Sequence, residues 1–377
     1  MPALDTQIEG QPQRSPLQRP VINVKNILEA HSRLKPYVLE TPLVHSLAFS
    51  QATGAKVWLK LENLQHTGSF KVRGALNKLV SLSPEQLAKG VVAASSGNHG
   101  AGVAWGLAKL GAKGVVFVPE GAAKTKLEAI RRLGAEVRFY GTDGADTEMY
   151  AREYSRQHGL SYISPYNDGD VIAGQGTIGV EIETQLPPHL WGRAGEGGLD
   201  RRSSGAAPSS RSESTIHSPH PNPLPQGERG LSVFVTVGGG GLVSGIASYL
   251  KSVSPDVQII GCQPENDAAM LASVRAGRIV EIDAKPTISD GSAGGLEPGA
   301  ITFDLCRTLV DTWVTVSEEE IHAAMREFIE GEGQNLEGAA GVALAAFLKT
   351  AEQYKGKNVV IVICGANIGP EKLKTVL

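Results

Sequence analysis

The stretch His66-Thr67-Gly68-Ser69-Phe70-Lys71-Val72-Arg73-Gly74-Ala75 carries the most information in this sequence of 377 residues. It follows a predicted strand over residues 56–62 and a polar loop, so Lys71 falls in the first turn of a predicted helix that Ser69 caps. The positive end of the helix dipole and partial burial both favour a neutral lysine amine there. Such an amine can form a Schiff base with an aldehyde cofactor, although a lone lysine is usually a surface residue.

The composition excludes several classes of protein. The net charge is -3 and no basic cluster stands out, so no nucleic-acid partner is expected. No apolar run approaches the roughly 20 residues that cross a bilayer, and the polar N-terminus lacks the apolar core of a signal peptide. Cys262, Cys306 and Cys364 lack the spacing of metal ligands, which predicts no metal site and favours a reducing cytoplasm.

Short β-rich runs alternate with helical runs through most of the chain. Strands are expected over residues 91–94, 114–119, 136–141, 161–165, 233–237, 257–263, 313–317 and 359–364, and helices over 100–110, 122–133, 146–158, 171–186, 242–251, 318–331 and 339–349. This order predicts an α/β fold with two open, twisted, mostly parallel sheets flanked by helices. The predicted domains are a large one, residues 21–86 and 166–377, and a small one, residues 87–165, with the active site in the cleft between them.

Two segments do not fit this pattern. Residues 1–20 are polar and rich in proline, which predicts a flexible tail. Residues 187–230 are rich in Gly, Ser, Pro and Arg, a composition that buries too little apolar surface to offset the entropy of ordering. A long functional loop such as a lid is the alternative, but the low complexity favours a disordered surface insertion.

A run of glycines, Gly238-Gly239-Gly240-Gly241-Leu242, follows one predicted strand directly and opens a helix. Residues without side chains let backbone N–H groups converge on an anion, and the helix dipole adds attraction, so this run predicts a phosphate site. A dinucleotide site is the competing interpretation, but the spacing G-x-G-x-x-G is not met and the P-loop pattern is absent. A plain tight turn needs fewer glycines.

Three further loops follow predicted strands. Ser95-Ser96-Gly97-Asn98-His99-Gly100 offers hydroxyls, an amide and N–H groups at a helix N-terminus, which suits a substrate carboxylate or ordinary helix capping. Cys364 follows the last strand, where a cysteine most often packs in the core. The glycine-rich stretch 289–299 is a candidate border of the substrate site. Together, the lysine, the phosphate site, the carboxylate loop and a small polar group at a strand end match the needs of pyridoxal phosphate.

These motifs, with Gly174-Gln175-Gly176-Thr177 and Cys364-Gly365-Ala366-Asn367, resemble the serine/threonine dehydratase family of fold-type II pyridoxal-phosphate enzymes, which includes serine racemase. The likeness runs from about Val21 to the C-terminus, interrupted by residues 187–230. It implies the tryptophan synthase β-like fold. It also implies that Lys71 carries the cofactor, Phe70 packs against the ring, Asn98 hydrogen-bonds the ring hydroxyl and Cys364 faces the ring nitrogen. The phosphate would be held by Gly238, Gly239, Gly240, Gly241 and Leu242.

The resemblance also implies how a substrate binds. Ser95, Ser96, Asn98 and His99 match the loop that takes the substrate carboxylate. Ser96 matches the residue that serves serine racemase as acid or base on the face opposite the lysine, so Lys71 and Ser96 are the predicted catalytic residues.

The sequence departs from the family in two respects. Where serine racemase holds a divalent cation partly by two carboxylates, the matching positions are Gln263 and Ala269, so no metal is expected. The sequence ends soon after Asn367, so the regulatory domain of biosynthetic threonine deaminases, and feedback control by isoleucine, are not expected either.

The implied function is that of an ammonia-lyase, a dehydratase that converts L-threonine, L-serine or both to 2-oxobutanoate or pyruvate and ammonia by α,β-elimination. A cytoplasmic homodimer or homotetramer is expected. A racemase, a dehydratase of another 3-hydroxy amino acid and a β-replacement enzyme such as cysteine synthase are alternatives on the same site. A non-catalytic protein that binds pyridoxal phosphate or an amino acid is an alternative of another class. A nucleotide-dependent dehydrogenase is the weakest option, because its fingerprint is missing.

Overall fold

The computed structural model describes residues 22–191 and 230–377. The predicted tail 1–20 lies outside the described residues, and so do residues 192–229 of the predicted insertion. The predicted start of that insertion was too early. Residues 188–191 form a short 3-10 helix, η2 (Pro188–Trp191), whose Leu190 and Trp191 are buried. The carbonyl of Leu190 also accepts a hydrogen bond from the Asn358 side chain at 3.1 Å.

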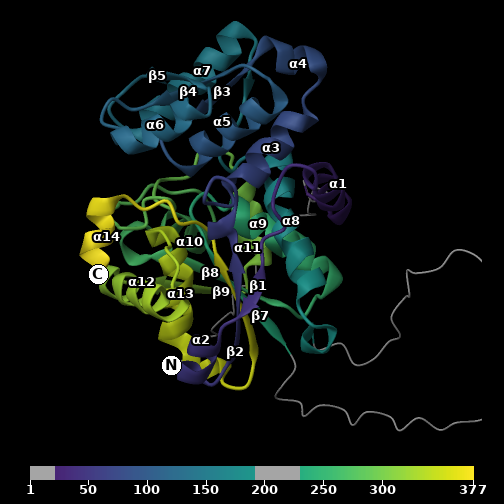
Figure 1. The fold of residues 1–377 in the computed structure, drawn as a ribbon, viewed down its shortest axis with the longest axis vertical. Coiled ribbons are helices and arrows are strands. Elements are labelled where there is room, and N and C mark those ends of the chain that lie inside the picture. Colours follow the sequence, from purple (N-terminus) through teal and green to yellow (C-terminus); the bar gives the residue numbers. More distant parts are fainter. Residues whose placement is uncertain (1–21, 192–229) are drawn as a thin grey trace, which may run out of the picture.

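The described chain forms two sheets with helices around them (Figure 1). The larger sheet has the strand order β1-β2-β10-β7-β8-β9 and is parallel except for the antiparallel pair β1–β2. Its strands are β1 (Leu43–His45), β2 (Lys56–Leu61), β7 (Leu231–Thr236), β8 (Gln258–Pro264), β9 (Thr312–Val316) and β10 (Asn358–Ile363). Every residue of β7 and β10 is buried, as expected for central strands of a sheet covered on both faces.

The smaller sheet is wholly parallel and has the order β5-β4-β3-β6. Its strands are β3 (Val91–Ala94), β4 (Gly114–Val118), β5 (Glu136–Phe139) and β6 (Ser161–Tyr162). Three helices accompany it: α5 (Asn98–Leu110), α6 (Lys124–Arg132) and α7 (Gly144–His158). A fourth helix, α4 (Pro84–Lys89), lies beside this sheet (Figure 1). We call residues 84–162 the small lobe and the other described residues the large lobe. The predicted fold class, with two mainly parallel sheets flanked by helices, is confirmed.

The helices of the large lobe cover both faces of its sheet. Helix α13 (Gly338–Thr350) packs on β7, β8 and β10 and against α12 (Glu318–Glu332), whereas α8 (Gly169–Gln185) and α9 (Gly241–Val253) lie on the other side (Figure 1). The remaining helices of the large lobe are α1 (Val24–Leu34), α2 (Leu47–Thr53), α3 (Lys71–Ser81), α10 (Ala269–Ala276), α11 (Ile301–Leu309) and α14 (Pro370–Val376), with the short 3-10 helices η1 (Glu62–Leu64), η4 (Glu265–Asp267) and η5 (Ala351–Tyr354).

Helix α3, which begins at Lys71, lies at the boundary between the lobes and packs against both α8 and α5. It is anchored by a buried ion cluster. The Arg73 guanidinium bonds Glu62 at 2.8 Å and Glu181 at 2.5 Å, and the Lys60 amine bonds Glu181 at 2.5 Å. All four side chains are at most 3% exposed. The cluster therefore joins α3 to β2, η1 and α8.

The cluster is balanced, with two cations and two carboxylates. Burial would lower the pKa of Arg73, but the carboxylates of Glu62 and Glu181 outweigh it, so the pKa is raised and the charge is secure. Burial would raise the pKa of Glu62, yet Arg73 and Lys60 hold it below its usual value. A buried charge is tolerated when its partners are complete and becomes costly when one is removed.

We expect Glu181→Gln to lower the free energy of unfolding by about 3–5 kcal/mol, because it leaves Arg73 and Lys60 with one carboxylate between them in the protein interior. Urea denaturation measures this loss. The matched control is Glu371→Gln on α14, which breaks an exposed ion pair with Lys374 and should cost less than about 1 kcal/mol. Equal losses for the two variants would contradict the role assigned to the buried cluster.

Candidate active site

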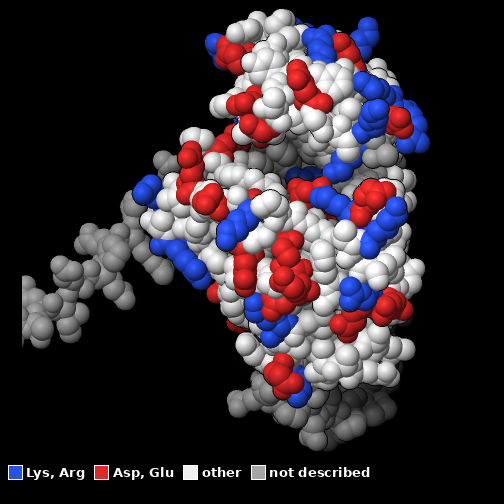
Figure 2. Space-filling view, turned by 90° about the vertical axis from the view of Figure 1, so that its left-hand side faces the viewer, with Lys and Arg blue, Asp and Glu red and all other residues white. Residues whose placement is uncertain are grey.

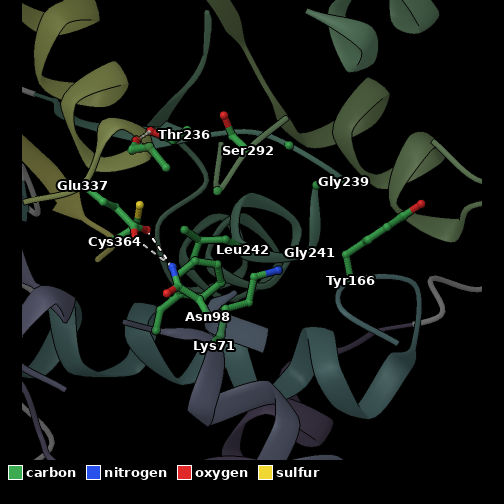
Figure 3. A pocket seen from close by; sticks show the side chains of 15 residues that line it. Lys71, Asn98, Tyr166, Thr236, Gly239, Gly241, Leu242, Ser292, Glu337 and Cys364 are labelled. Atoms are coloured by element: carbon green, nitrogen blue, oxygen red, sulfur yellow. Dashed lines mark hydrogen bonds between the residues drawn. The ribbon is translucent and has the colours of Figure 1, made fainter. Parts of the chain in front are cut away.

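A pocket lies beside the start of α3 and is lined by residues of both lobes (Figure 3). Figure 2 shows that the surface is hollowed between the lobes, with acidic and basic side chains at the rim of the hollow. The pocket is lined by Phe70, Lys71, Asn98, Tyr166, Thr236, Gly238, Gly239, Gly240, Gly241, Leu242, Gly291, Ser292, Glu337, Ala339 and Cys364.

The loops that line the pocket come from neighbouring strands of the large sheet. Strand β10 lies between β2 and β7, and all three run in the same direction. Their carboxyl ends therefore share one edge of the sheet, where the loops that follow them meet. The loop after β2 leads to Lys71, the glycine run follows β7, and Cys364 follows β10 directly.

The prediction that Ser69 caps α3 was wrong, and the reason is the way the backbone pairs at this edge of the large sheet. The N-cap residue is Phe70, and within the described residues no side chain caps the helix. Ser69 instead forms a β-bridge with Gly365, and the N–H of Phe70 donates to the carbonyl of Cys364 at 3.1 Å. This pairing holds the start of α3 against the end of β10, and it brings Lys71 next to Cys364.

The Lys71 amine is poised between its charged and neutral forms. Removal from water lowers its pKa to about 8, although Cys364, Glu148 and Glu337 act to raise it. The Nζ atom donates to the carbonyl of Pro165 at 3.0 Å and lies 5.3 Å from the centroid of the Phe70 ring. About a tenth of the amine is therefore neutral at pH 7, far more than for an ordinary lysine, and the neutral form is what a nucleophile or a base requires.

The glycine run forms a cradle that side chains would fill. A Cβ at Gly238 would lie 2.6 Å from the carbonyl oxygen of Ser292, and one at Gly239 would enter the ring of Tyr166. Gly240 has a φ of +84°, and a Cβ there would lie 2.8 Å from the sulfur of Cys306. The run leads into α9, which no described side chain caps. Its first N–H groups, which lack partners within the helix, are therefore available to an anion.

Cys364 is 2% exposed and its sulfur lies in the pocket (Figure 3). Burial raises the pKa of the thiol well above its usual value, and the nearby Glu337 adds to the shift. The thiol is therefore neutral at neutral pH. A neutral thiol is a weak hydrogen-bonding group that offers no negative charge to a ligand.

The predicted substrate loop only partly faces the pocket. Asn98 lines it, whereas Ser95, Ser96 and His99 are not among the described lining residues. Ser95 and Ser96 are half-buried in the turn before α5, and the Ser95 hydroxyl accepts from the N–H of Gly97 at 3.1 Å. His99 is 2% exposed and its Nε2 bonds the carbonyl of Ile163 at 2.8 Å. Burial and the charge of Lys71 lower the pKa of His99 to about 3, so its ring is neutral.

The structure thus brings together Phe70, Lys71, Asn98, the run Gly238–Leu242 and Cys364, which are separated widely in the sequence. Sequence reasoning missed Tyr166, Thr236, Glu337 and Ala339. Gly291 and Ser292 belong to the stretch 289–299, which was expected to border the site without an assigned role. The one available signal for Glu337 was a carboxylate directly before a long apolar helix, and that pattern is also typical of helix capping.

Comparison with known proteins identifies the family to which this chain belongs. The sequence matches the family of pyridoxal-phosphate dependent enzymes over residues 34–199 and 226–365. The chain belongs to this family, and its cofactor is pyridoxal phosphate. The pocket fits that cofactor: Lys71 offers an amine to the aldehyde, and the glycine cradle at α9 offers N–H groups to the phosphate.

Three known proteins show which members of this family the chain is similar to. The chain is 39% identical to an L-threonine ammonia-lyase of Thermotoga maritima over 348 residues, 92% of this chain and 76% of that protein. Among solved structures it is similar to the processed form of threonine deaminase isoform 2 from Solanum lycopersicum, with a TM-score of 0.78, 32% identity and coverage of 94% and 86%. It is also similar to maize serine racemase, with a TM-score of 0.78, 27% identity and coverage of 94% and 96%.

We expect Gly240→Ala to weaken pyridoxal phosphate binding at least about tenfold and to lower the free energy of unfolding by about 2–4 kcal/mol, because a Cβ meets Cys306 and the backbone is left-handed. Absorbance titration of the cofactor-free chain measures the first effect, and urea denaturation measures the second. Gly333→Ala is the matched control, since Gly333 has a φ of +65° but nothing lies within 4 Å of its Cβ position. Unchanged cofactor affinity in Gly240→Ala would contradict the cradle.

The lowered pKa of Lys71 predicts the pH dependence of cofactor attachment. Below its pKa of about 8 the amine is mostly protonated, so the attachment rate should rise about tenfold per pH unit and level off above about pH 8. Stopped-flow absorbance after mixing the cofactor-free chain with pyridoxal phosphate measures the rate, with Lys71→Ala as the blank. A rate that keeps rising to pH 10 would indicate an ordinary lysine and contradict this assignment.

Proposed function

We propose that this protein is a pyridoxal-phosphate-dependent ammonia-lyase that converts L-threonine, and also L-serine, to 2-oxobutanoate or pyruvate with release of ammonia. The observation that carries the proposal is that one pocket holds both the partly neutral Lys71 amine and the neutral Cys364 thiol. The similarity to an L-threonine ammonia-lyase and to a threonine deaminase supports this substrate class. No described helix is both long and apolar enough to cross a membrane.

Each group of residues in the pocket would have its own role in such a reaction. Bound pyridoxal phosphate supplies an electron sink for the bonds at the substrate Cα. The Lys71 amine would hold the cofactor and, once released from it, would accept the proton from the substrate Cα at its Nζ atom. The glycine cradle and the N–H groups of α9 would hold the phosphate, Phe70 would pack against the ring, and Asn98 would donate to the ring hydroxyl.

Cys364 is proposed to face the ring nitrogen. Its thiol is neutral because burial and Glu337 raise its pKa. A carboxylate at this place would keep the ring nitrogen protonated and strengthen the electron sink, whereas a neutral thiol does not. Loss of the β-hydroxyl then competes well with transfer of the amino group, which is the balance an ammonia-lyase needs.

The loop before α5 is the proposed site of the substrate carboxylate. Its backbone N–H groups lie at the N-terminus of α5, where an anion is favoured. Ser95, Ser96 and Asn98 would offer polar side-chain atoms, whereas His99 would act through its main chain because its ring bonds Ile163. Ser96 is the proposed acid or base on the face opposite Lys71.

The protein is proposed to work in the cytoplasm as a homodimer or homotetramer. Sedimentation measures the number of subunits.

The activity is tested by the release of 2-oxo acids from L-threonine and L-serine. We expect Lys71→Ala to lower kcat by at least about 10³-fold, because it removes both the attachment point of the cofactor and the base. Lactate dehydrogenase coupled to NADH oxidation measures pyruvate, and derivatised 2-oxobutanoate is measured by chromatography. Undiminished turnover in Lys71→Ala would contradict the proposal.

The similarity to maize serine racemase makes racemisation the second candidate on the same site. Chiral chromatography of the recovered serine separates the two reactions, because elimination consumes L-serine without forming D-serine. We expect Ser96→Ala to abolish any D-serine while release of pyruvate from L-serine persists. Cofactor absorbance with neither product would indicate a protein that binds pyridoxal phosphate without catalysis.

A further inference from the structure

The side chain of Glu337 lines the pocket, yet the scheme above uses it only as a charge that helps to raise the pKa of Cys364. It is the N-cap residue of α13 and is 4% exposed. A carboxylate at this place commonly caps its own helix, but among the described hydrogen bonds of α13 there is no cap from the Glu337 side chain. It points instead toward Asn98 and Cys364 (Figure 3).

Both carboxylate oxygens of Glu337 accept from the same side-chain donor, Asn98. The Nδ2 atom of Asn98 donates to Oε1 at 2.8 Å and to Oε2 at 2.9 Å. The Oδ1 atom of Asn98 accepts from Nδ2 of Asn367 at 2.7 Å, and this same Nδ2 donates to the carbonyl of Thr67 at 2.7 Å. The two ends of the Asn98 amide are thus held by different residues of the large lobe, although Asn98 itself belongs to the small lobe. Its orientation is fixed across the lobe boundary.

The carboxyl group is costly to keep in this place. No salt bridge to Glu337 is present in the described parts of the chain. Burial raises its pKa to about 7, and Asp290 adds to the shift, while Asn98 and Lys126 oppose it. The carboxyl group of Glu337 is also tightly packed against the backbone of Gly365, because a Cβ at Gly365 would lie 2.5 Å from Oε1 of Glu337. A buried carboxyl group without a cation destabilises the fold unless its position serves the site.

We propose that Glu337 is a positioning residue that holds the Asn98 amide across the lobe boundary. The two oxygens of Glu337 share one hydrogen of Asn98 Nδ2, which leaves the other hydrogen for the cofactor. The proposal rests on the proposed function, in which Asn98 donates to the ring hydroxyl of pyridoxal phosphate. Glu337 acts through Asn98 and needs no contact with the substrate. A carboxylate suits this task because it binds only the donor end of the amide and so excludes the flipped orientation.

A double-mutant cycle on cofactor affinity tests this role. We expect Glu337→Ala to weaken pyridoxal phosphate binding on the order of 10- to 100-fold, the range for loss of a hydrogen bond to a charged group. In the Asn98→Ala background the same substitution should change affinity by less than about twofold, because the residue that Glu337 holds is gone. Affinity is measured by absorbance titration of the cofactor-free chain, without any assay of turnover.

The controls separate positioning from folding. Glu337→Gln keeps the shape and one acceptor oxygen, so it should weaken binding only about threefold to tenfold, and it completes the same cycle if Glu337→Ala does not fold. Glu332→Gln alters a carboxylate outside the pocket, bonded to the Ser46 hydroxyl at 2.5 Å, and should leave cofactor affinity unchanged. Thermal unfolding of each cofactor-free variant reports any structural loss.

Failure of this inference and failure of the proposed function give different results. If borohydride traps no pyridoxal phosphate on Lys71 of the wild-type chain, the proposed function fails. If trapping succeeds but both Glu337 variants bind the cofactor like wild type, or weaken binding equally with and without Asn98, the positioning role is wrong. A lower melting temperature with unchanged affinity also overturns it, because it indicates a purely structural side chain.

Discussion

The guanidinium of Arg73, enclosed between Glu62 and Glu181, is the interaction on which the site depends. Arg73 lies two residues after Lys71 in α3, so the place of the guanidinium determines the place of the amine. Charged side chains that are removed from water are stable only when their partners are placed correctly. The ion pairs of Arg73 therefore fix the position of α3 relative to both η1 and α8. The helix that carries Lys71 therefore has one position between the two lobes, and that position does not depend on its own cap.

The parallel sheet supplies the second constraint. Because β10 lies between β2 and β7, the loops after these strands converge although they are separated by about 100 to 300 residues. The small lobe completes the pocket from the other side through Asn98, which is bonded to Glu337 and Asn367 of the large lobe. Lys71, the glycine run and the contact between the lobes thus meet in one pocket, so a substitution at any of them is expected to disturb the others.

Much of the fold could be predicted, for identifiable reasons. The strands at residues 91–94 and 359–364 were found because a strand covered on both faces is a short apolar run bounded by glycine or polar residues. The segments missed include the helices α1, α10 and α11 and the strand β1. Most of them are short, and a short segment offers few repeats of its hydrophobic period. The cap at Ser69 failed because its backbone pairs with Gly365, nearly 300 residues away, and no local pattern reveals that pairing.

The sequence by itself determined the cofactor class, because an aldehyde and a phosphate need a lysine and a glycine run directly beside strands, and both features are local. It also determined the alternation of strands and helices, since hydrophobic periodicity is local too. Only the tertiary structure decided that Glu337 faces Asn98, that the His99 ring turns away to Ile163, and how far burial lowers the pKa of Lys71, of which the sequence predicted only the direction. Each of these depends on which distant groups exclude water from an atom, and burial is a property of the packed chain.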